Sequence, residues 1–504
     1  MMQKPLNSRE LFARYAQLAE ERPNDYAVII EREPFAGTKL TWAGLMQRAT
    51  DFAATLGASG IRGGSRCAVT LTDHPDTLPL LVALWKLDAT AVLIDRLWGA
   101  RRRDGVIAHS GAQCAISVED GLVIATAGQA SPAPLHELPE GTALLGYTSG
   151  STGDPKGVAF VHDKLALTMQ AAASAIVNYR GSAPSRIGCS MRLSGSGVLN
   201  LHFTWAAFSS ATTVVLPELT IASARNYWSR IEELGIEQTF LVPPLIELLN
   251  HVAQPRPGLA PPPICLTGSA PLSARTQERF RQKFGLPLLN AYGLSESMCA
   301  SFFGQLDANG EATNSIGLPW LLEARIKRSD GDIVAGEAEG ELELAGPTLF
   351  SGYYGNPSAT AEAFDGRWFR TGDIVRRDGS GRFHIVGRRK DVVMKGGFSV
   401  YFNEVEEAAL AISGVLEAAV VPVMLPQGED IGLIVRIAKD TSISADEVLQ
   451  LVRDDIGAPR SPYRALHIDA GLPRTGQDKL DRKQIILLWD SLVKERGQQE
   501  LTTA

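Results

Sequence analysis

Residues 147–158 read Tyr147-Thr148-Ser149-Gly150-Ser151-Thr152-Gly153-Asp154-Pro155-Lys156-Gly157-Val158, and apolar runs flank them at residues 143–146 and 158–161. Glycine lets consecutive backbone N–H groups turn toward an anion. The hydroxyl side chains add hydrogen-bond donors, and the lysine adds a compact positive charge. The stretch therefore predicts a polyphosphate-binding loop, whose candidate ligands are Thr148, Ser149, Gly150, Ser151, Thr152, Gly153 and Lys156.

The lysine of this loop has the wrong neighbours for a Walker A motif. Pro155 precedes Lys156 and Gly157 follows it, whereas Walker A has Gly before the Lys and Ser or Thr after it. The apolar flanks predict strands on both sides, so the loop joins two strands instead of opening a helix. Both features argue against a conventional P-loop NTPase. A flexible Ser/Gly surface loop is the alternative interpretation.

Outward from the loop, short apolar strands alternate with helical stretches. We expect a helix at residues 78–86 and strands at residues 66–71, 89–94, 212–216, 239–242, 264–266 and 288–291. Such alternation is typical of buried strands in an α/β protein. After residue 386 a charged segment, Gly387-Arg388-Arg389-Lys390-Asp391, precedes a further set of strands and helices. We therefore predict an α/β fold with a large N-terminal domain of several subdomains, residues 1–388, and a small α+β domain, residues 389–504.

The composition excludes several classes of protein. The 504 residues are too many for one hydrophobic core, and a net charge of −7 gives no basic surface for nucleic acid or anionic lipid. The N-terminal residues contain no apolar signal segment, and no apolar run reaches the ~18 residues of a membrane span. We therefore expect a cytoplasmic protein. The five cysteines form no CxxC pair, which favours buried free thiols over a zinc site.

Further motifs follow the loop along the chain. Gly268-Ser269-Ala270-Pro271 and Ala291-Tyr292-Gly293-Leu294-Ser295-Glu296 both occur at the ends of expected strands. Phe369-Arg370-Thr371-Gly372-Asp373 offers a carboxylate, whose paired lone pairs suit two neighbouring hydroxyls. A last segment reads Pro473-Arg474-Thr475-Gly476-Gln477-Asp478-Lys479-Leu480. Singly, each motif could be an ordinary turn or strand end. Their order along the chain makes coincidence negligible.

Together these motifs resemble those of the adenylate-forming superfamily, which contains acyl- and aryl-CoA synthetases, luciferases and peptide-synthetase adenylation domains. The resemblance implies that the loop holds the β- and γ-phosphates of ATP and that Glu296 holds Mg²⁺, a cation that prefers oxygen ligands. It implies a hinge at Lys390, a mobile C-terminal domain, and catalytic roles for Lys479, Ser295 and Glu296. It also implies that adenosine contacts Gly268, Ser269, Ala270, Ala291, Tyr292, Gly293, Asp373 and Arg388.

The implied reaction has two steps. A carboxylate attacks the α-phosphate and releases pyrophosphate, giving an acyl-adenylate, and a thiol then displaces AMP. Lys479, Mg²⁺ and Ser295 would stabilise the developing charge. The sequence departs from the family pattern at Ser295, where threonine is usual, and at Asp478, where glycine is usual. These departures leave a degenerate, non-catalytic binding homologue as an alternative.

The resemblance also bears on the acid and the thiol. Residues 189–199 contain no acidic side chain, which disfavours an α-amino acid. The Leu-Ser-x-x-Gly-Val-Leu pattern of residues 193–199 resembles that of aryl-acid-activating members and favours an aryl or other small to medium organic acid. The expected acid pocket contains His162, Ser190, Met191, Ser194, Gly195 and Leu294. Gly396 and Gly397 would line a channel for the thiol. Coenzyme A is the expected acceptor, and the phosphopantetheine of an acyl or peptidyl carrier protein in trans is the alternative.

Overall fold

The computed structural model describes residues 9–119, 121–126, 136–148, 156–256, 258, 263–270, 272–306, 313–426, 428–439, 441–475 and 480–502. The chain divides into two compact units, Met1–Ala324 with Leu344–Arg370 and Arg325–Glu343 with Thr371–Ala504. The predicted domain boundary between residues 388 and 389 stays a prediction. Within the described residues, no helix is both long enough and apolar enough to cross a membrane.

A seven-stranded sheet in the first unit carries the two strands that flank the phosphate loop. Its order is β19-β8-β7-β4-β3-β5-β6, with β3 (Arg66–Leu71), β4 (Thr90–Asp95), β5 (Cys114–Ser117), β6 (Val123–Thr126), β7 (Thr142–Thr148), β8 (Lys156–Val161) and β19 (Tyr353–Tyr354). Strand β4 is buried along its whole length, as its continuous apolar sequence predicts. Strands β7 and β8 are antiparallel, with Thr148 opposite Lys156. The predicted strand–loop–strand arrangement is confirmed for its two strands.

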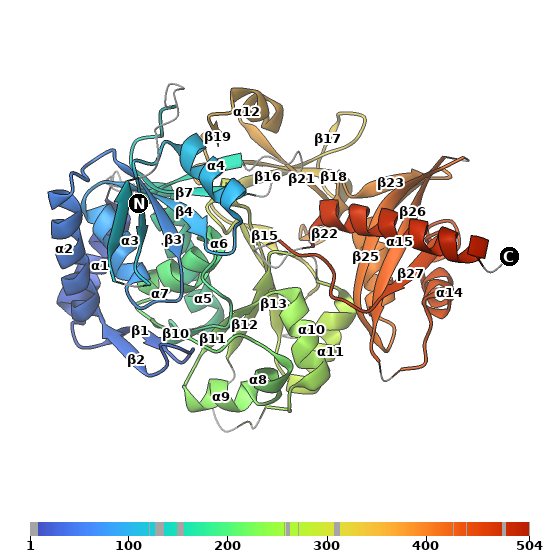
Figure 1. The fold of residues 1–504 in the computed structure, drawn as a ribbon, viewed down its shortest axis with the longest axis horizontal. Coiled ribbons are helices and arrows are strands. Elements are labelled where there is room, and N and C mark those ends of the chain that lie inside the picture. Colours follow the sequence, from blue (N-terminus) through green and yellow to red (C-terminus); the bar gives the residue numbers. More distant parts are fainter. Residues whose placement is uncertain are drawn as a thin grey trace. The chain divides into compact units, whose positions relative to one another are not determined.

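Helices α1 (Glu10–Glu21), α2 (Trp42–Ala58) and α3 (Thr77–Lys86) pack against one another beside this sheet, as Figure 1 shows. The ring of Tyr15 lies 6.0 Å from that of Trp42 and 5.9 Å from that of Trp85, which joins the three helices. Helices α4 (Ala100–Ser110) and α5 (His162–Arg180) follow strands β4 and β8. These helices and the sheet therefore form α/β layers, as the apolar pattern of the sequence predicts.

The first unit also contains a nine-stranded sheet, in the order β15-β14-β13-β12-β11-β9-β10-β1-β2. Its strands are β1 (Tyr26–Ile30), β2 (Thr38–Thr41), β9 (Arg186–Cys189), β10 (Thr212–Val215), β11 (Gln238–Leu241), β12 (Ile264–Gly268), β13 (Leu288–Tyr292), β14 (Phe302–Phe303) and β15 (Leu318–Pro319). Strands β9 to β13 are parallel to their neighbours among themselves. Because β9 lies between β10 and β11, the chain order reverses at β9. Ligands of such sheets bind beyond the carboxyl ends of the strands near the reversal.

The helices that follow the strands of the nine-stranded sheet bury a large aromatic core. Trp228, Phe280 and Phe284 pack with ring centroids 5.0 to 5.8 Å apart. The helical elements are α6 (Ser196–Val198), the π-helix η1 (Leu199–Thr204), α7 (Trp205–Phe208), α8 (Ile221–Arg225), α9 (Tyr227–Glu233), α10 (Pro243–Val252), α11 (Ala274–Phe284) and the 3₁₀ turn η2 (Ser295–Ser297). A π-helix is rare, and such turns occur often at functional sites.

A further sheet has the order β17-β16-β18-β21-β20, with β22 paired to β21. Its strands are β16 (Glu323–Lys327), β17 (Ile333–Val334), β18 (Ala338–Ala345), β20 (Phe364–Asp365), β21 (Trp368–Arg377) and β22 (Phe383–Arg388), and the short helix α12 (Pro357–Ala363) precedes β20. Strands β21 and β22 form an antiparallel hairpin.

The C-terminal part of the second unit is a small α+β layer structure, as predicted. It contains β23 (Val392–Lys395), β24 (Phe398–Tyr401), α13 (Phe402–Leu410), β25 (Val415–Leu425), β26 (Gly428–Ile437), α14 (Ala445–Ile456), β27 (Arg464–Ile468) and α15 (Arg482–Thr502). Helices α13 and α14 share one core with the sheet β25-β26-β27. Trp489 of α15 packs with Ile434 and Leu466 in a separate core. Figure 1 shows α15 lying along this sheet.

Candidate active site

The phosphate loop is anchored at both ends by the β7–β8 hairpin. Thr148 donates its hydroxyl to the carbonyl of Lys156 at 3.4 Å across the hairpin. The preceding Tyr147 is buried, and its hydroxyl shares a 2.8 Å hydrogen bond with Nδ1 of His109. Thr148 and Lys156 are thus held at the mouth of the loop. The remaining predicted loop ligands, Ser149, Gly150, Ser151, Thr152 and Gly153, lie outside the described residues.

Tyr353 joins the loop lysine to the predicted magnesium ligand. The Nζ atom of Lys156 lies 4.6 Å from the centre of the Tyr353 ring, within cation–π range. The Tyr353 hydroxyl donates to Oε1 of Glu296 at 2.8 Å. Strand β19 fixes Tyr353 by pairing it with Val158 of β8. Two motifs about 140 positions apart in the chain therefore meet around one tyrosine, which the sequence motifs did not single out.

The turn after β13 positions Ser295 and Glu296. The Leu294 N–H donates to Oγ of Ser297 at 3.1 Å, which starts the 3₁₀ turn η2. The carbonyl of Glu296 accepts the N–H of Phe350 at 2.8 Å. Two successive left-handed residues, Met298 (φ 57°) and Cys299 (φ 81°), then reverse the chain. Left-handed backbone costs energy in residues other than glycine, and such residues concentrate at functional sites.

Two glycines allow backbone segments to approach closely beside this turn. A Cβ atom on Gly268 would lie 2.2 Å from the Ala291 carbonyl oxygen, and one on Gly293 would lie 2.0 Å from the Cys299 carbonyl oxygen. Gly268 stands opposite Ala291 in the parallel pair β12–β13. The predicted adenosine contacts Gly268, Ser269, Ala270, Ala291, Tyr292 and Gly293 therefore gather at the carboxyl ends of two neighbouring strands. An adenine contact for Tyr292 stays a prediction.

The other predicted adenosine contacts, Asp373 and Arg388, pair with each other in the second unit. They stand opposite each other in the β21–β22 hairpin, and Arg388 Nε donates to Asp373 Oδ1 at 2.7 Å. Asp373 is buried, whereas Arg388 is exposed. The Asp373 N–H also donates to Oγ1 of Thr371 at 3.1 Å. Arg388 thus orients the carboxylate, and Thr371 holds the backbone of Asp373.

The expected hinge and thiol channel occupy exposed turns of the second unit. Lys390 is exposed just after β22. Gly396 (φ 56°) and Gly397 (φ 87°) form the turn between β23 and β24. Glycine suits this turn because both residues have positive φ. The turn geometry alone accounts for both glycines, so the hinge and channel roles stay predictions.

The segment with the expected catalytic lysine is anchored on its N-terminal side. Arg474 donates to Oε1 of Glu417 at 2.9 Å and makes an isolated β-bridge with Leu480. The Leu472 N–H donates to the other oxygen of Glu417 at 3.2 Å. Lys479 itself lies outside the described residues, as does Asp478. The role of Lys479 stays a prediction from its motif.

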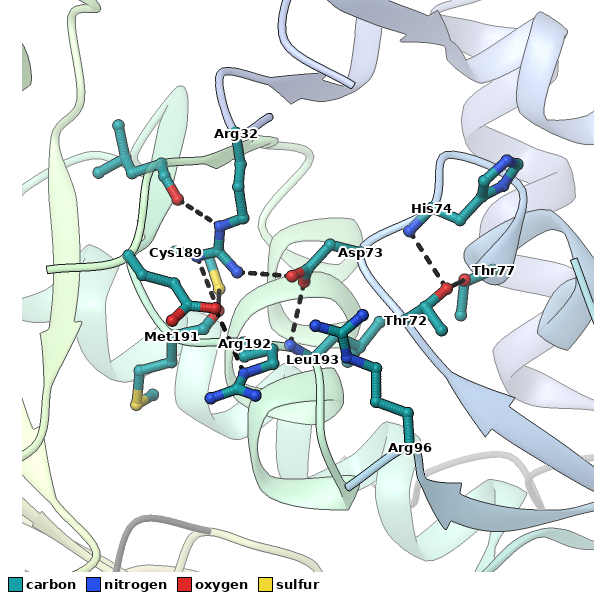
Figure 2. A network of polar contacts seen from close by, with 12 residues as sticks. Arg32, Thr72, Asp73, His74, Thr77, Arg96, Cys189, Met191, Arg192 and Leu193 are labelled. Carbon is teal, nitrogen blue, oxygen red and sulfur yellow. Dashed lines mark hydrogen bonds and ion pairs between the residues drawn. The ribbon is translucent and has the colours of Figure 1, made fainter. Parts of the chain in front are cut away.

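The loop after β9 is fixed by a buried ion pair, shown in Figure 2. Arg32 NH1 lies 2.7 Å from Asp73 Oδ2, and their side chains are 8% and 16% exposed. Asp73 also accepts the Leu193 N–H at 3.1 Å, and Arg32 donates to the Met191 carbonyl at 3.2 Å. Since Asp73 follows β3 and Met191 follows β9, the pair ties together the carboxyl ends of strands from two sheets. No sequence motif indicated this contact.

A cavity opens at the carboxyl ends of β11, β12 and β13. Four aromatic side chains line it, from Trp205, Phe240, Phe303 and Trp320. The other lining residues are Leu201, Ser269, Ala291, Gly293, Cys299 and Ala300. Of these ten, only Ser269, Ala291 and Gly293 were site candidates from the sequence. Predicted strand ends indicate only part of this aromatic wall. Trp205 directly follows the π-helix η1 and Trp320 lies in a loop, so neither marks the end of a predicted strand.

The predicted acid-pocket residues are buried or half-buried in the first unit. Ser190 is buried, and Met191, Ser194, Gly195 and Leu294 are half-buried. His162 begins α5 and is packed edge-on to Trp85 at 6.2 Å, where burial lowers its pKa to about 4. None of these six residues lines the cavity described above. Their contact with an acid stays a prediction.

Comparison with known proteins adds to this geometry. The model of the AMP-binding enzyme family matches residues 15–354, and the model of the AMP-binding enzyme C-terminal domain matches residues 404–479. A feruloyl-CoA synthase from Amycolatopsis sp is 28% identical, over 89% of this chain and 94% of that protein. A sulfoacetate–CoA ligase from Cupriavidus necator is 29% identical, over 90% of this chain and 93% of that protein.

A solved structure shares the fold at lower identity. It is the o-succinylbenzoate CoA synthetase from Bacillus subtilis in complex with its acyl-adenylate intermediate. Its TM-score is 0.79 at 22% identity, covering 94% of this chain and 97% of that chain. This similarity supports the fold alone.

Proposed function

The chain belongs to the family of AMP-binding enzymes, and we propose that it activates an aryl or other small to medium carboxylic acid with ATP and transfers the acyl group to coenzyme A. The chain is similar to CoA ligases over most of its length, and it is an AMP-forming ligase. The observation that carries the chemistry is the contact of Tyr353 with both Lys156 and Glu296. It holds a cation and a carboxylate at one place, as ATP with a divalent cation requires.

The first step forms a bond between a carboxylate oxygen of the acid and the α-phosphorus of ATP. The bond from that phosphorus to the bridging oxygen breaks, and pyrophosphate leaves with the electron pair. Lys156, at the mouth of the loop, would offer positive charge to the departing phosphates, and Thr148 would offer its hydroxyl in place of its 3.4 Å hydrogen bond to the Lys156 carbonyl. Ser295, at the start of η2, offers a further hydroxyl.

Glu296 has the chemistry of a magnesium ligand. Its side chain is half-buried, and its Oε1 atom accepts the hydroxyl of Tyr353. Oxygen donors of this kind fit Mg²⁺. When bound, the ion would supply positive charge that offsets the charge of the phosphates. Tyr353 would keep the Glu296 carboxylate in one orientation.

In the second step a thiolate attacks the acyl carbon, and AMP leaves. Asp373 would hold the ribose hydroxyls, since Arg388 orients its carboxylate. Lys479 would stabilise the charge on the α-phosphate in the first step. Coenzyme A is the proposed acceptor, because the relatives named above are coenzyme A enzymes. A carrier-protein phosphopantetheine is the second candidate.

Acid-dependent exchange between ATP and labelled pyrophosphate tests the proposal. A panel of carboxylic acids should include at least one that supports exchange, and Lys479→Ala should abolish it. Lys483→Ala is the matched control, because Lys483 is an exposed residue of α15. Exchange that survives Lys479→Ala would remove the lysine from the mechanism. Mass spectrometry of the products with coenzyme A, or with a phosphopantetheinylated carrier protein, would identify the acceptor.

A further inference from the structure

The segment that joins β9 to α6, residues 190–195, is held by side chains from distant parts of the chain. We call it the acid loop, because the predicted acid contacts Ser190, Met191, Ser194 and Gly195 belong to it. Among the described residues, the backbone of residues 191–193 forms hydrogen bonds with side chains alone. Buried backbone is usually held by other backbone groups. The conformation of the acid loop therefore depends on the side chains that contact it.

Arg32 reaches the ends of three neighbouring strands with one guanidinium group. It follows β1, and its Nε atom donates to the Leu216 carbonyl, beyond β10, at 2.8 Å. Its Nη2 atom donates to the Met191 carbonyl, beyond β9, at 3.2 Å. Strands β9, β10 and β1 are parallel neighbours, so their carboxyl ends lie at one edge of the sheet. The rigid fork of an arginine suits such a contact, which a lysine cannot reproduce.

Asp73 completes the contact from the seven-stranded sheet. Its Oδ2 atom lies 2.7 Å from Nη1 of Arg32, and its Oδ1 atom accepts the Leu193 N–H at 3.1 Å, as Figure 2 shows. The turn that carries Asp73 is held in turn, because the His74 N–H donates to Oγ1 of Thr72 at 3.3 Å. Both carboxylate oxygens and all three guanidinium nitrogens thus have partners. Buried charges are tolerated when they are paired and hydrogen-bonded in this way.

The residues proposed to bind ATP are held by other contacts. Tyr353 lies against Lys156 and donates to Glu296, and Thr148 is held across the β7–β8 hairpin. The bonds of Arg32 and Asp73 end instead on the acid loop, at Met191 and Leu193, and at Leu216 beside it. A change in the ion pair should therefore displace the acid loop and leave the residues around Tyr353 in place.

We propose that Arg32 and Asp73 are positioning residues for the acid, which hold the acid loop in the conformation that receives it. The inference rests on the proposed function and adds to it two residues that lie outside the sequence motifs. Neither residue has to touch the acid, because Arg32 acts through the Met191 carbonyl and Asp73 through the Leu193 N–H. Loss of the pair weakens the binding of the acid and spares that of ATP.

Replacing both residues tests the proposal without leaving a charge unpaired. Arg32→Met with Asp73→Leu removes the ion pair and both contacts to the loop, and apolar replacement of a buried ion pair often preserves folding. Pyrophosphate exchange is measured with benzoate, phenylacetate, cinnamate and hexanoate, and the acid with the highest wild-type kcat/KM is used. Its KM should rise about tenfold, the effect of losing such hydrogen bonds, while the KM for magnesium–ATP stays within about twofold.

A merely structural role predicts a different pattern. A smaller fraction of folded enzyme would lower kcat and leave the KM of both substrates unchanged. A general distortion of the site would raise the KM of the acid and that of magnesium–ATP together. Either pattern in the double variant would overturn the proposal.

Arg32→Lys decides the matter if the double variant does not fold, as thermal unfolding would show. The lysine keeps a positive charge beside Asp73 but cannot reach Leu216, Asp73 and Met191 together. We expect the KM of the acid to rise about threefold or more with the KM for magnesium–ATP unchanged. An unchanged KM for the acid in this variant would overturn the proposal.

Glu218→Gln is the matched control. Glu218 pairs with Arg192 of the same loop at 3.3 Å, but the two side chains are 48% and 32% exposed. Exposed ion pairs contribute little to conformation. The KM of the acid should therefore stay close to that of the wild type. A rise as large as in the double variant would contradict the assignment of the effect to the buried pair.

The outcomes separate this inference from the function on which it rests. Wild-type exchange with none of the four acids would overturn the proposed function itself. Wild-type exchange with at least one acid, together with an unaltered acid KM in the variants, would leave the ligase function intact and overturn the role of Arg32 and Asp73 alone.

Discussion

Adding one methyl group at Gly293 should displace the turn that carries Ser295 and Glu296. The new Cβ would lie 2.0 Å from the Cys299 carbonyl oxygen, 2.5 Å from its carbon and 2.8 Å from Cα of Ala300. All three atoms belong to the backbone, so no side chain can rotate away. Ordinary contact begins near 3.4 Å, which requires a backbone shift of about 1 Å or more.

Such a shift has two measurable consequences. Overpacking of this kind costs about 1–3 kcal/mol, so the urea midpoint of Gly293→Ala should fall. The displaced turn should lower kcat/KM in pyrophosphate exchange by about a hundredfold, since misplacement of about 1 Å has that effect on catalysis. The loss should exceed what the fraction of unfolded protein explains.

Gly197→Ala is the matched control for this prediction. No heavy atom lies within 4 Å of a Cβ placed on Gly197, and its φ is not positive. Its urea midpoint and exchange activity should remain close to those of the wild type. If Gly293→Ala behaves like this control, the close approach of Gly293 and Cys299 does not position the site, and the reasoning fails.

Two further predictions concern Tyr353 and Glu407. Tyr353→Phe keeps the ring beside Lys156 but removes the hydrogen bond to Glu296. The KM for magnesium–ATP should therefore rise about threefold to tenfold in steady-state assays, while the stability of the protein stays unchanged. An unaltered KM would exclude Tyr353 from positioning the Glu296 carboxylate. In the second unit, burial and then the Glu406 charge raise the pKa of Glu407 to about 7 from its usual 4.5, so stability falls as the pH rises through this interval. Glu407→Gln should therefore raise the free energy of unfolding by up to about 3 kcal/mol at pH ~8 and leave it unchanged near pH ~4.5. Urea titrations at the two pH values measure this difference. An equal gain in unfolding free energy at both pH values would refute the burial of this carboxylate.

Much of the fold follows from local sequence patterns. Strand β3 has the bounds that its apolar run predicts, and β7 and β8 flank the phosphate loop as the sequence indicates. Apolar periodicity specifies such elements because each one must bury its own side chains. The sequence also predicts where β12 and β13 end, because Gly268 and Gly293 mark places where only glycine fits.

The contacts that complete the site depend on distant parts of the chain, and the sequence could not reveal them. Tyr353 reaches Glu296 only because β19 pairs with β8. Arg32 and Asp73 meet only because two sheets place their strand ends together. The aromatic wall of the cavity is harder still to predict, because Trp205 follows a π-helix, which no residue pattern specifies. Local propensity does not encode such long-range convergence.

The central claim is that this chain is an AMP-forming acid–CoA ligase, and its products test that most directly. The enzyme is incubated with magnesium–ATP, coenzyme A and the best acid of the panel, and the nucleotides and thioesters are quantified together. Our account predicts AMP, pyrophosphate and acyl-CoA in equal amounts. ADP with inorganic phosphate, or ATP consumption that does not depend on the acid, would contradict it.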